Sequence, residues 1–405
     1  MINNNKRNEI QNEALQHWIK AGKIGTVEIA TGVGKTFVFL HALHTMPKNK
    51  EKIHLYLAET NQRERDLEKT ITLFDKIFKK QTKKDYIIQF NCYQSAYKWE
   101  NKRFGLVCGD EIHDSLTPTY SLFYQNNEYE ALIGLSAKID VKTRYDVTRG
   151  LITTTLTKGF YLNKYCPVIY KYSLDDARDD NLNRDLDIHV IFNKLDDKIK
   201  NVAAGSAKKR FYQTEQQAYD FWSKRLAQAL DEESGKSNKL FARISALRRS
   251  VILYSLPSKI EATKKLVKHL KRTLIFGNHI DSLLKITPNV ISSKNKDDKN
   301  EKIRNDFESN KIDLIGSFKM LKQGANIKGL DNLVIMSYYS SEKDVIQRLG
   351  RARKDGNRKG KVFIFVTENT QEEKWYLRMF ENINAYNVIS HKNVDECITY
   401  INEKA

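Results

Sequence analysis

Residues 26–36, T-V-E-I-A-T-G-V-G-K-T, have the types and spacing of a phosphate-binding loop. A β-branched run predicts a short strand, two glycines predict a tight turn, and the apolar residues 37–40 predict a helix directly after it. Backbone N–H groups at such a helix start converge on an anion, and the helix dipole adds about half a positive charge. Lys35 would reach the β- and γ-phosphates of a nucleotide, and the Thr36 hydroxyl would bind Mg²⁺. We expect the nucleotide to be contacted by Thr31, Gly32, Val33, Gly34, Lys35 and Thr36.

Two adjacent carboxylates, Asp110 and Glu111, directly follow the apolar run 104–108. Carboxylates at the end of a buried strand can hold Mg²⁺ and activate water. We expect Asp110, with Thr36, to bind the metal, and Glu111 to polarise the attacking water. We expect His113 to couple this site to a neighbouring domain. An acidic surface turn is the alternative, and the phosphate loop upstream disfavours it.

A third group of residues, Q-R-L-G-R-A-R at 347–353, lies early in a helix predicted to begin near Ser341. Gly350 interrupts this helix at a cost of about 1 kcal/mol relative to alanine. Arginine forks bind phosphate through two parallel hydrogen bonds. We therefore expect these arginines to meet a γ-phosphate, where such groups accelerate phosphoryl transfer by several orders of magnitude.

Strands alternating with helical stretches must position these groups. Alternation of this kind predicts parallel sheets, whose functional groups gather at the carboxyl ends of the strands. In the first half the polar clusters follow the expected strands 52–58, 86–90, 104–108 and 131–135. In the second half the expected strands are 187–192, 273–277, 289–291, 312–316, 333–336 and 362–366. We predict an α/β fold with domains at 1–175 and 186–405, an acidic linker at 175–185, and a basic, largely helical insertion at about 195–270.

Composition adds a strong positive charge, with 69 Lys and Arg against 50 Asp and Glu and a net charge of +19. Such a balance favours polyanionic partners, nucleic acid before acidic membranes, although a lysine-rich solvated surface is the alternative. The four cysteines show no C-x-x-C pair and no histidine at ligand spacing, so no zinc site is expected. No signal sequence or apolar run of about 20 residues is present, which predicts a soluble cytoplasmic protein, in the host cytoplasm if phage-encoded.

The order of these motifs resembles that of superfamily 2 helicases of the DExH type. Gln11 resembles the adenine-reading glutamine of that family, and the remaining motifs match in order: motif I at 30–36, II at 110–113, III at 136–138, IV at 274–276, V at 321–327 and VI at 347–353. The resemblance implies two RecA-like domains in tandem, with ATP and Mg²⁺ as cofactors. It implies catalytic roles for Lys35, Asp110, Glu111, Gln347 and Arg351. It implies further nucleotide contacts from Gln11, Gly324, Asn326, Arg348 and Arg353.

Two positions depart from the family pattern. Lys138 stands in motif III where threonine is usual, which bears on the coupling of hydrolysis to strand separation. The Q-x-x-G-R-x-R spacing of motif VI leaves open whether Arg353 is the second arginine finger or the finger is missing. No nuclease, methylase or zinc module is recognised at either end, which favours a free-standing, monomeric motor of phage or bacterial type.

The resemblance implies an ATP-dependent helicase or translocase, acting on DNA in preference to RNA and with 3′-to-5′ polarity. Replication, recombination or repair would be its setting, and protein partners from these processes or from restriction are left open. The alternatives are an RNA helicase, an ATP-switched nucleic-acid clamp that never unwinds, and a restriction motor subunit.

Overall fold

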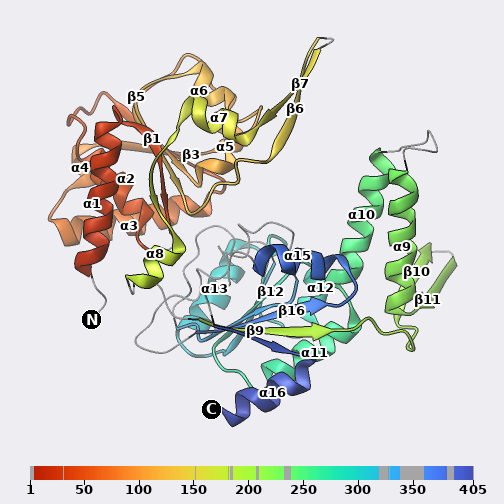
Figure 1. Cartoon of the computed structure of the whole chain (residues 1–405). Coiled ribbons are helices and arrows are strands. Elements are labelled where there is room, and N and C mark those ends of the chain that lie inside the picture. Colours follow the sequence, from red (N-terminus) through yellow and green to blue (C-terminus); the bar gives the residue numbers. More distant parts are fainter. Residues whose placement is uncertain are drawn as a thin grey trace. The chain divides into compact units, whose positions relative to one another are not determined.

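The computed structural model describes residues 4–30, 32–150, 152–180, 182, 186–206, 209–231, 239–318, 327, 329–337, 360–380 and 387–404. The chain forms two compact units (Figure 1). The first contains Met1–Asn183, and the second contains Arg184–Lys322 together with Asn326–Ala405.

The first unit is built on a six-stranded parallel sheet in the order β3-β2-β4-β5-β1-β8. Its strands are β1 (Ile24–Ile29), β2 (Ile53–Ala58), β3 (Ile87–Cys92), β4 (Arg103–Asp110), β5 (Glu128–Ser136) and β8 (Val168–Tyr172). The strands read as continuous apolar runs because both faces of the sheet are covered. Tyr56 packs into one core cluster with Phe39 and Phe74, whereas its neighbour Leu57 packs into the other with Phe123.

Helices cover both faces of this sheet. They are α1 (Asn4–Lys20), α2 (Lys35–Leu43), α3 (Gln62–Phe78), α4 (Thr82–Asp85), α5 (Tyr93–Ala96), α6 (Leu122–Asn126) and α7 (Lys158–Tyr165), with the 3₁₀ turn η1 (Ile112–Asp114). An antiparallel hairpin that the sequence pattern did not predict, β6 (Arg144–Arg149) with β7 (Ile152–Thr157), projects away from the sheet (Figure 1).

The acidic stretch 175–185, expected to be a linker, begins instead with a helix of the first unit, α8 (Leu174–Asp179). Ser173 and Asp176 cap its start reciprocally, since each side chain accepts a hydrogen bond from the backbone N–H of the other. Ala177 and Leu182 are buried in the core of the first unit. The acidic side chains of α8 therefore lie on its solvent-exposed side, while its apolar side packs against the first unit.

The second unit contains a seven-stranded parallel sheet in the order β13-β14-β12-β15-β16-β9-β17. Its strands are β9 (Leu186–Asn193), β12 (Thr273–Gly277), β13 (Val290–Ile291), β14 (Leu314–Phe318), β15 (Asn332–Ile335), β16 (Gly360–Thr367) and β17 (Asn387–His391). The helices packed with it are α11 (Pro257–Val267), α12 (Ile280–Leu284), α13 (Asp297–Glu308), α15 (Gln371–Phe380) and α16 (Val394–Glu403). The two parallel sheets confirm the predicted fold class, and β17 adds an edge strand that was not predicted.

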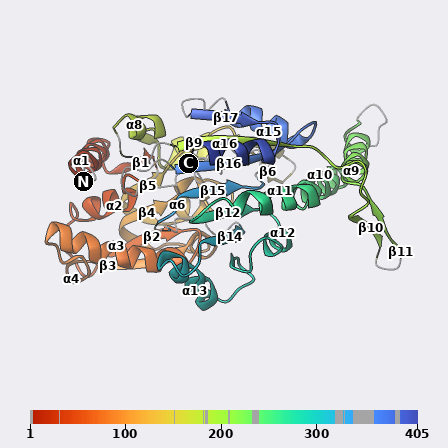
Figure 2. The same ribbon diagram turned by 90° about the horizontal axis from the view of Figure 1, so that it is seen from below.

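The predicted insertion is confirmed between β9 and β12. It contains the hairpin β10 (Val202–Ser206) with β11 (Lys209–Gln213), followed by α9 (Glu215–Leu230) and α10 (Lys239–Tyr254). Thr214 and Gln217 form a capping box at the start of α9. Figure 2 shows this hairpin and helix pair standing off one end of the unit's sheet. Among the described residues, no helix has the length and apolar character needed to cross a bilayer.

Candidate nucleotide-binding site

The glycine-rich loop follows β1 and leads into α2, as the sequence predicts. Gly32 and Gly34 have φ values of 97° and 102°, a region that disfavours residues with a side chain. A Cβ on Gly34 would also lie only 2.6 Å from the Gln11 amide nitrogen. Gly34 is therefore required both by its backbone conformation and by its neighbour. Thr31 lies outside the described residues.

Gln11 lies on α1 and ties that helix to the loop. Its side chain is buried, and Nε2 donates a hydrogen bond to the Val33 carbonyl at 2.8 Å. Its Oε1 accepts no hydrogen bond within the described part of the chain. A buried amide oxygen without a partner costs about 1–3 kcal/mol, so this acceptor is suited to a ligand that donates.

Lys35 and Glu111 form an ion pair at 2.9 Å across 76 residues of sequence. Both side chains are largely buried, with exposed fractions of 11% and 13%. Glu111 follows β4 directly and has left-handed backbone angles, φ 49° and ψ 52°. Strained residues of this kind concentrate at functional sites and cost about 1–3 kcal/mol. The structure thus brings the loop and the acidic pair together at the carboxyl edge of the sheet.

Asp110 is paired with a residue that the sequence reasoning missed. Its Oδ2 lies 2.6 Å from a guanidinium nitrogen of Arg63 on α3, and the two side chains are 3% and 15% exposed. Burial alone would lower the pKa of Arg63, but Asp110, Tyr56 and Glu111 outweigh burial and raise it. The sequence places Arg63 in the first turn of the helix that follows β2, but only the sheet order, in which β2 adjoins β4, brings it to Asp110.

His113 connects the acidic motif to the end of β5. The ring is fully buried, and Nδ1 lies 2.7 Å from Ser136 Oγ and 3.5 Å from Glu111 Oε2. Ser136 also donates a hydrogen bond to the Lys138 carbonyl at 3.2 Å. These described contacts of His113 lie within the first unit, whereas coupling to a neighbouring domain was expected. They join residues 110–113 to residues 136–138.

A third acidic residue, Asp114, lies beside this network. Burial, followed by the nearby Glu59 and Glu111 carboxylates, raises the pKa of Asp114 well above its usual range. The site thus concentrates acidic groups in a buried setting, where Lys35 pairs with Glu111 and Arg63 pairs with Asp110. Such a constellation at a strand edge is suited to a ligand that carries a divalent cation.

In the second unit, residues 274–276 form the buried middle of β12. The predicted site residues of that half lie outside the described residues: Gly324, Asn326, Gln347, Arg348, Arg351 and Arg353. Their expected contacts with nucleotide stay predictions.

Two family models match the chain in order. Residues 4–140 match the type III restriction enzyme res subunit, and residues 258–356 match the helicase conserved C-terminal domain. The second match includes all the predicted residues of motifs V and VI. Residues between 140 and 258, which include the β6–β7 hairpin and most of the insertion, fall in neither match.

Similar proteins agree with these matches. The DNA 3′-5′ translocase XPB2 of Sulfurisphaera tokodaii is 21% identical over 383 residues, covering 90% of this chain and 82% of the relative. The DNA-bound type ISP restriction-modification enzyme LlaBIII has a TM-score of 0.60 at 13% identity, over 95% of this chain and 31% of that enzyme. Dbp5 of S. cerevisiae, bound to RNA and ADP BeF3, has a TM-score of 0.60 at 12% identity, over 97% and 92%. These structures share the fold, and this chain spans about a third of LlaBIII.

The tandem family matches, the two parallel sheets and the paired loop and acidic motifs all agree with the expected resemblance. Proteins of this kind use ATP and act on nucleic acid. The chain belongs to the superfamily 2 helicases and translocases.

Proposed function

We propose that the chain is an ATP-driven 3′-to-5′ DNA translocase that separates strands during replication, recombination or repair. The observation that carries the ATPase part is the contact between Lys35 and Glu111 beside the Asp110–Arg63 pair. DNA and polarity are supported by the relative named as a DNA 3′-5′ translocase. The net charge of +19 supports a polyanionic track.

Nucleotide binding in this proposal exchanges one partner of Lys35 for another. In the structure, Lys35 Nζ donates a hydrogen bond to Glu111 Oε1 at 2.9 Å. The β- and γ-phosphates, cradled by the loop and the start of α2, would draw Lys35 away from the carboxylate. Gln11 would accept a hydrogen bond from the adenine amino group through Oε1, which has no partner among the described residues.

The donor set at this edge fits Mg²⁺, because Thr36 offers a hydroxyl oxygen and Asp110 a carboxylate, both hard ligands. When bound, the ion would offset phosphate charge. Arg63 holds Asp110 through Oδ2 and so fixes the direction of the other carboxylate oxygen. Arg63 is therefore a positioning residue in this proposal, and Thr36 and Asp110 are the ligands.

Hydrolysis then depends on Glu111, whose carboxylate would orient the attacking water once Lys35 has moved to phosphate. The His113–Ser136 hydrogen bond would pass a change at Glu111 to the residues after β5. Arg351 would contact the γ-phosphate, with Gln347, Arg348 and Arg353 as further contacts and Gly324 and Asn326 as nucleotide contacts.

Parallel ATPase assays with single-stranded DNA, duplex DNA and RNA test this function. We expect DNA to stimulate hydrolysis more than RNA of the same sequence. Streptavidin displacement from biotinylated 3′ and 5′ ends then reports direction, with Glu111→Gln as the inactive control. Preferential stimulation by RNA would favour an RNA helicase. ATP-dependent tightening on DNA without displacement or unwinding would favour a clamp.

A restriction motor subunit is the second candidate, because the match over residues 4–140 is to a restriction res subunit. This candidate predicts translocation along duplex DNA, measured by displacement of a third strand, without separation of the two strands. Efficient unwinding of a forked substrate by the chain alone would contradict it.

A further inference from the structure

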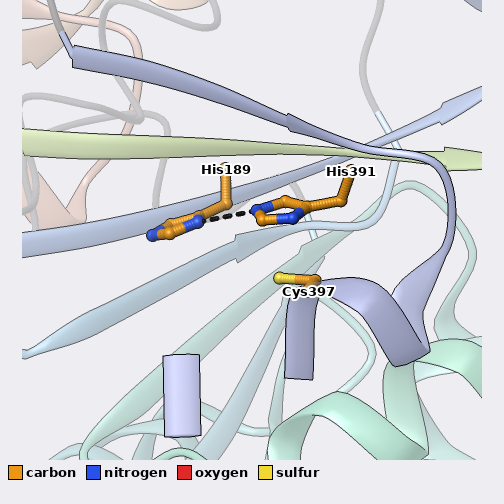
Figure 3. A group of neighbouring side chains, drawn as sticks. All are labelled: His189, His391 and Cys397. Atoms are coloured by element: carbon orange, nitrogen blue, oxygen red, sulfur yellow. Dashed lines mark hydrogen bonds between the residues drawn. The ribbon is translucent and has the colours of Figure 1, made fainter. Parts of the chain in front are cut away.

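Three buried side chains with metal-ligand chemistry meet in the second unit, far from the glycine-rich loop in sequence. They are His189 on β9, His391 at the end of β17, and Cys397 on α16 (Figure 3). Each offers one nitrogen or sulfur atom, and these atoms all lie within 4.8 Å of one another. Among the residues that the structure describes, this is the one group of three or more His, Cys, Asp and Glu side chains with such a geometry.

Sheet register explains why the two histidines meet although 202 residues separate them. Strand β17 pairs in parallel with β9, and His189 lies opposite Ile389. His391 is two residues beyond Ile389 and therefore projects from the same face of the sheet as His189. His189 Nδ1 lies 3.0 Å from His391 Nε2.

The turn after β17 brings the cysteine to this pair. Asn393 caps α16 by accepting a hydrogen bond from the Glu396 backbone N–H at 2.9 Å, which fixes the first turn of the helix. Cys397 follows in the next turn, fully buried, with its sulfur facing the two rings in Figure 3. Strand, cap and helix together bring three ligand atoms within 4.8 Å of one another.

The spacing of the nitrogen atoms is close to that of a tetrahedral zinc site. Two nitrogens at about 2.0–2.1 Å from Zn²⁺ lie about 3.3 Å apart, close to the 3.0 Å observed between Nδ1 and Nε2. Binding would replace the hydrogen bond between the rings, which must turn so that both nitrogens point at the ion. A His₂Cys donor set combines imidazole with thiolate, which suits zinc.

We propose that His189, His391 and Cys397 bind one Zn²⁺ ion, which joins the first strand of the second unit to its last strand and helix. The role is structural, and the ion completes its coordination with a fourth ligand such as water. On binding, Cys397 loses its thiol proton to solvent, and the imidazole that donates the hydrogen bond moves its proton to its other ring nitrogen. One proton is therefore released for each zinc bound.

The competing explanation is a neutral histidine pair that packs without metal. His189 stacks on Phe363 with ring centroids 4.9 Å apart, and Tyr400 meets both histidines edge-on. Packing also accounts for the burial of Cys397, which lies in the apolar core of the unit beside Val394 and Ile401. What favours a metal is that one sulfur and two imidazole nitrogens lie within 4.8 Å of one another. His54 makes the contrast: it is also buried, yet its Nδ1 accepts a hydrogen bond from the Leu106 backbone N–H, and no metal group includes it.

The test uses the full chain, stripped with a chelator and then titrated with Zn²⁺. We expect one zinc per chain by elemental analysis after gel filtration. Zinc at about a hundredfold excess over its Kd should raise the melting temperature of the second unit by about 5–10 °C. Co²⁺ in place of zinc should give a thiolate-to-cobalt charge-transfer band, which only a sulfur ligand produces.

Variants assign the ligands. Cys397→Ser and His391→Gln should each weaken zinc binding by about a hundredfold or more, and Cys397→Ser should abolish the charge-transfer band. Cys166→Ala and His54→Gln are the controls, since each removes a buried side chain of the same type outside the group, and both should bind zinc normally.

Less than one zinc per wild-type chain at saturating metal would overturn the site, whatever the variants do. So would a folded Cys397→Ser variant that keeps the wild-type stoichiometry. If Cys397→Ser does not fold, the wild-type cobalt band and the His391→Gln titration decide the question without it.

Discussion

Replacing Arg63 with methionine tests whether a buried ion pair organises the nucleotide site. Arg63 and Asp110 lie 2.6 Å apart, with exposed fractions of 15% and 3%. Methionine keeps most of the aliphatic body of arginine and removes its charge, so packing changes little. Asp110 is then left buried beside Glu111 without its cation.

Removing one partner of a buried pair costs about 3–5 kcal/mol, because the remaining charge is uncompensated. For a unit of this size, about 2–4 °C of melting temperature corresponds to each kcal/mol, which gives a decrease of about 6–20 °C. Asp110→Asn in the same chain removes the orphaned charge. The double variant should therefore be more stable than the sum of the single effects by about 1–3 kcal/mol.

Denaturant unfolding followed by circular dichroism measures these changes, and hydrogen exchange read by mass spectrometry assigns them to the first unit. Arg103→Met is the matched control. Arg103 and Glu128 lie at a similar distance, 2.8 Å, but their side chains are 84% and 72% exposed. Exposed pairs contribute at most about 1 kcal/mol, so this variant should be close to wild type.

The reasoning would be refuted if Arg63→Met were no less stable than Arg103→Met. Additive effects of Arg63→Met and Asp110→Asn would also count against it. At temperatures where Arg63→Met remains folded, ATP turnover should still fall, because Asp110 has lost the group that orients it. Normal turnover there would separate the stability of the pair from any role in positioning the metal ligand.

The remaining predictions concern turnover and nucleic-acid binding. Lys35→Ala should abolish ATP hydrolysis and leave DNA binding without nucleotide nearly intact, measured by ATPase and fluorescence anisotropy; equal loss of both in a folded variant would count against the phosphate role of Lys35. Glu111→Gln should trap ATP, with turnover reduced steeply and ATP-dependent DNA binding retained, and wild-type turnover would exclude Glu111 as the base. Arg351→Ala should leave ATP affinity within a few-fold of wild type but lower turnover by about two orders of magnitude, with little rescue by lysine; normal turnover at saturating ATP and DNA would make Arg351 an ordinary surface cation. The logarithm of DNA affinity should fall with the logarithm of salt concentration at a slope of about −5 to −7, as expected for about 6–8 phosphate contacts. A slope near zero would mean that the +19 charge only forms a solvated surface and does not bind DNA.

Much of this molecule follows from its sequence, because the informative signals are local. The glycine-rich loop needs only the order of neighbouring residues: Gly32 and Gly34 must adopt positive φ, and Lys35 must begin the helix. Buried parallel strands are also recognisable locally. Because both faces of the sheet are covered, these strands are continuous apolar runs and do not alternate between apolar and polar residues. The two sheets, the helical insertion and the acidic pair at the end of β4 were all predicted on these grounds.

Local signals are weaker where a segment's environment decides its structure. The stretch 175–185 has the charge of a linker, yet tertiary contacts bury Ala177 and Leu182 and hold α8 against the first unit. The hairpins β6–β7 and β10–β11 were not predicted either. Their strands are short and largely exposed, so their residues show little of the apolar patterning on which sequence reasoning depends.

Only the tertiary structure decides which distant residues meet, because sheet order is not written in any single segment. The order β2-β4 within the first sheet places Arg63 against Asp110, and the order β9-β17 within the second places His189 against His391. Neither pair could be recognised from its spacing in the sequence. Arg63 and Asp110 have 46 residues between them, and the two histidines are 202 positions apart. The sequence therefore determines which side chains stand at or near each strand end, whereas the order of strands in the sheet determines which of these side chains pair.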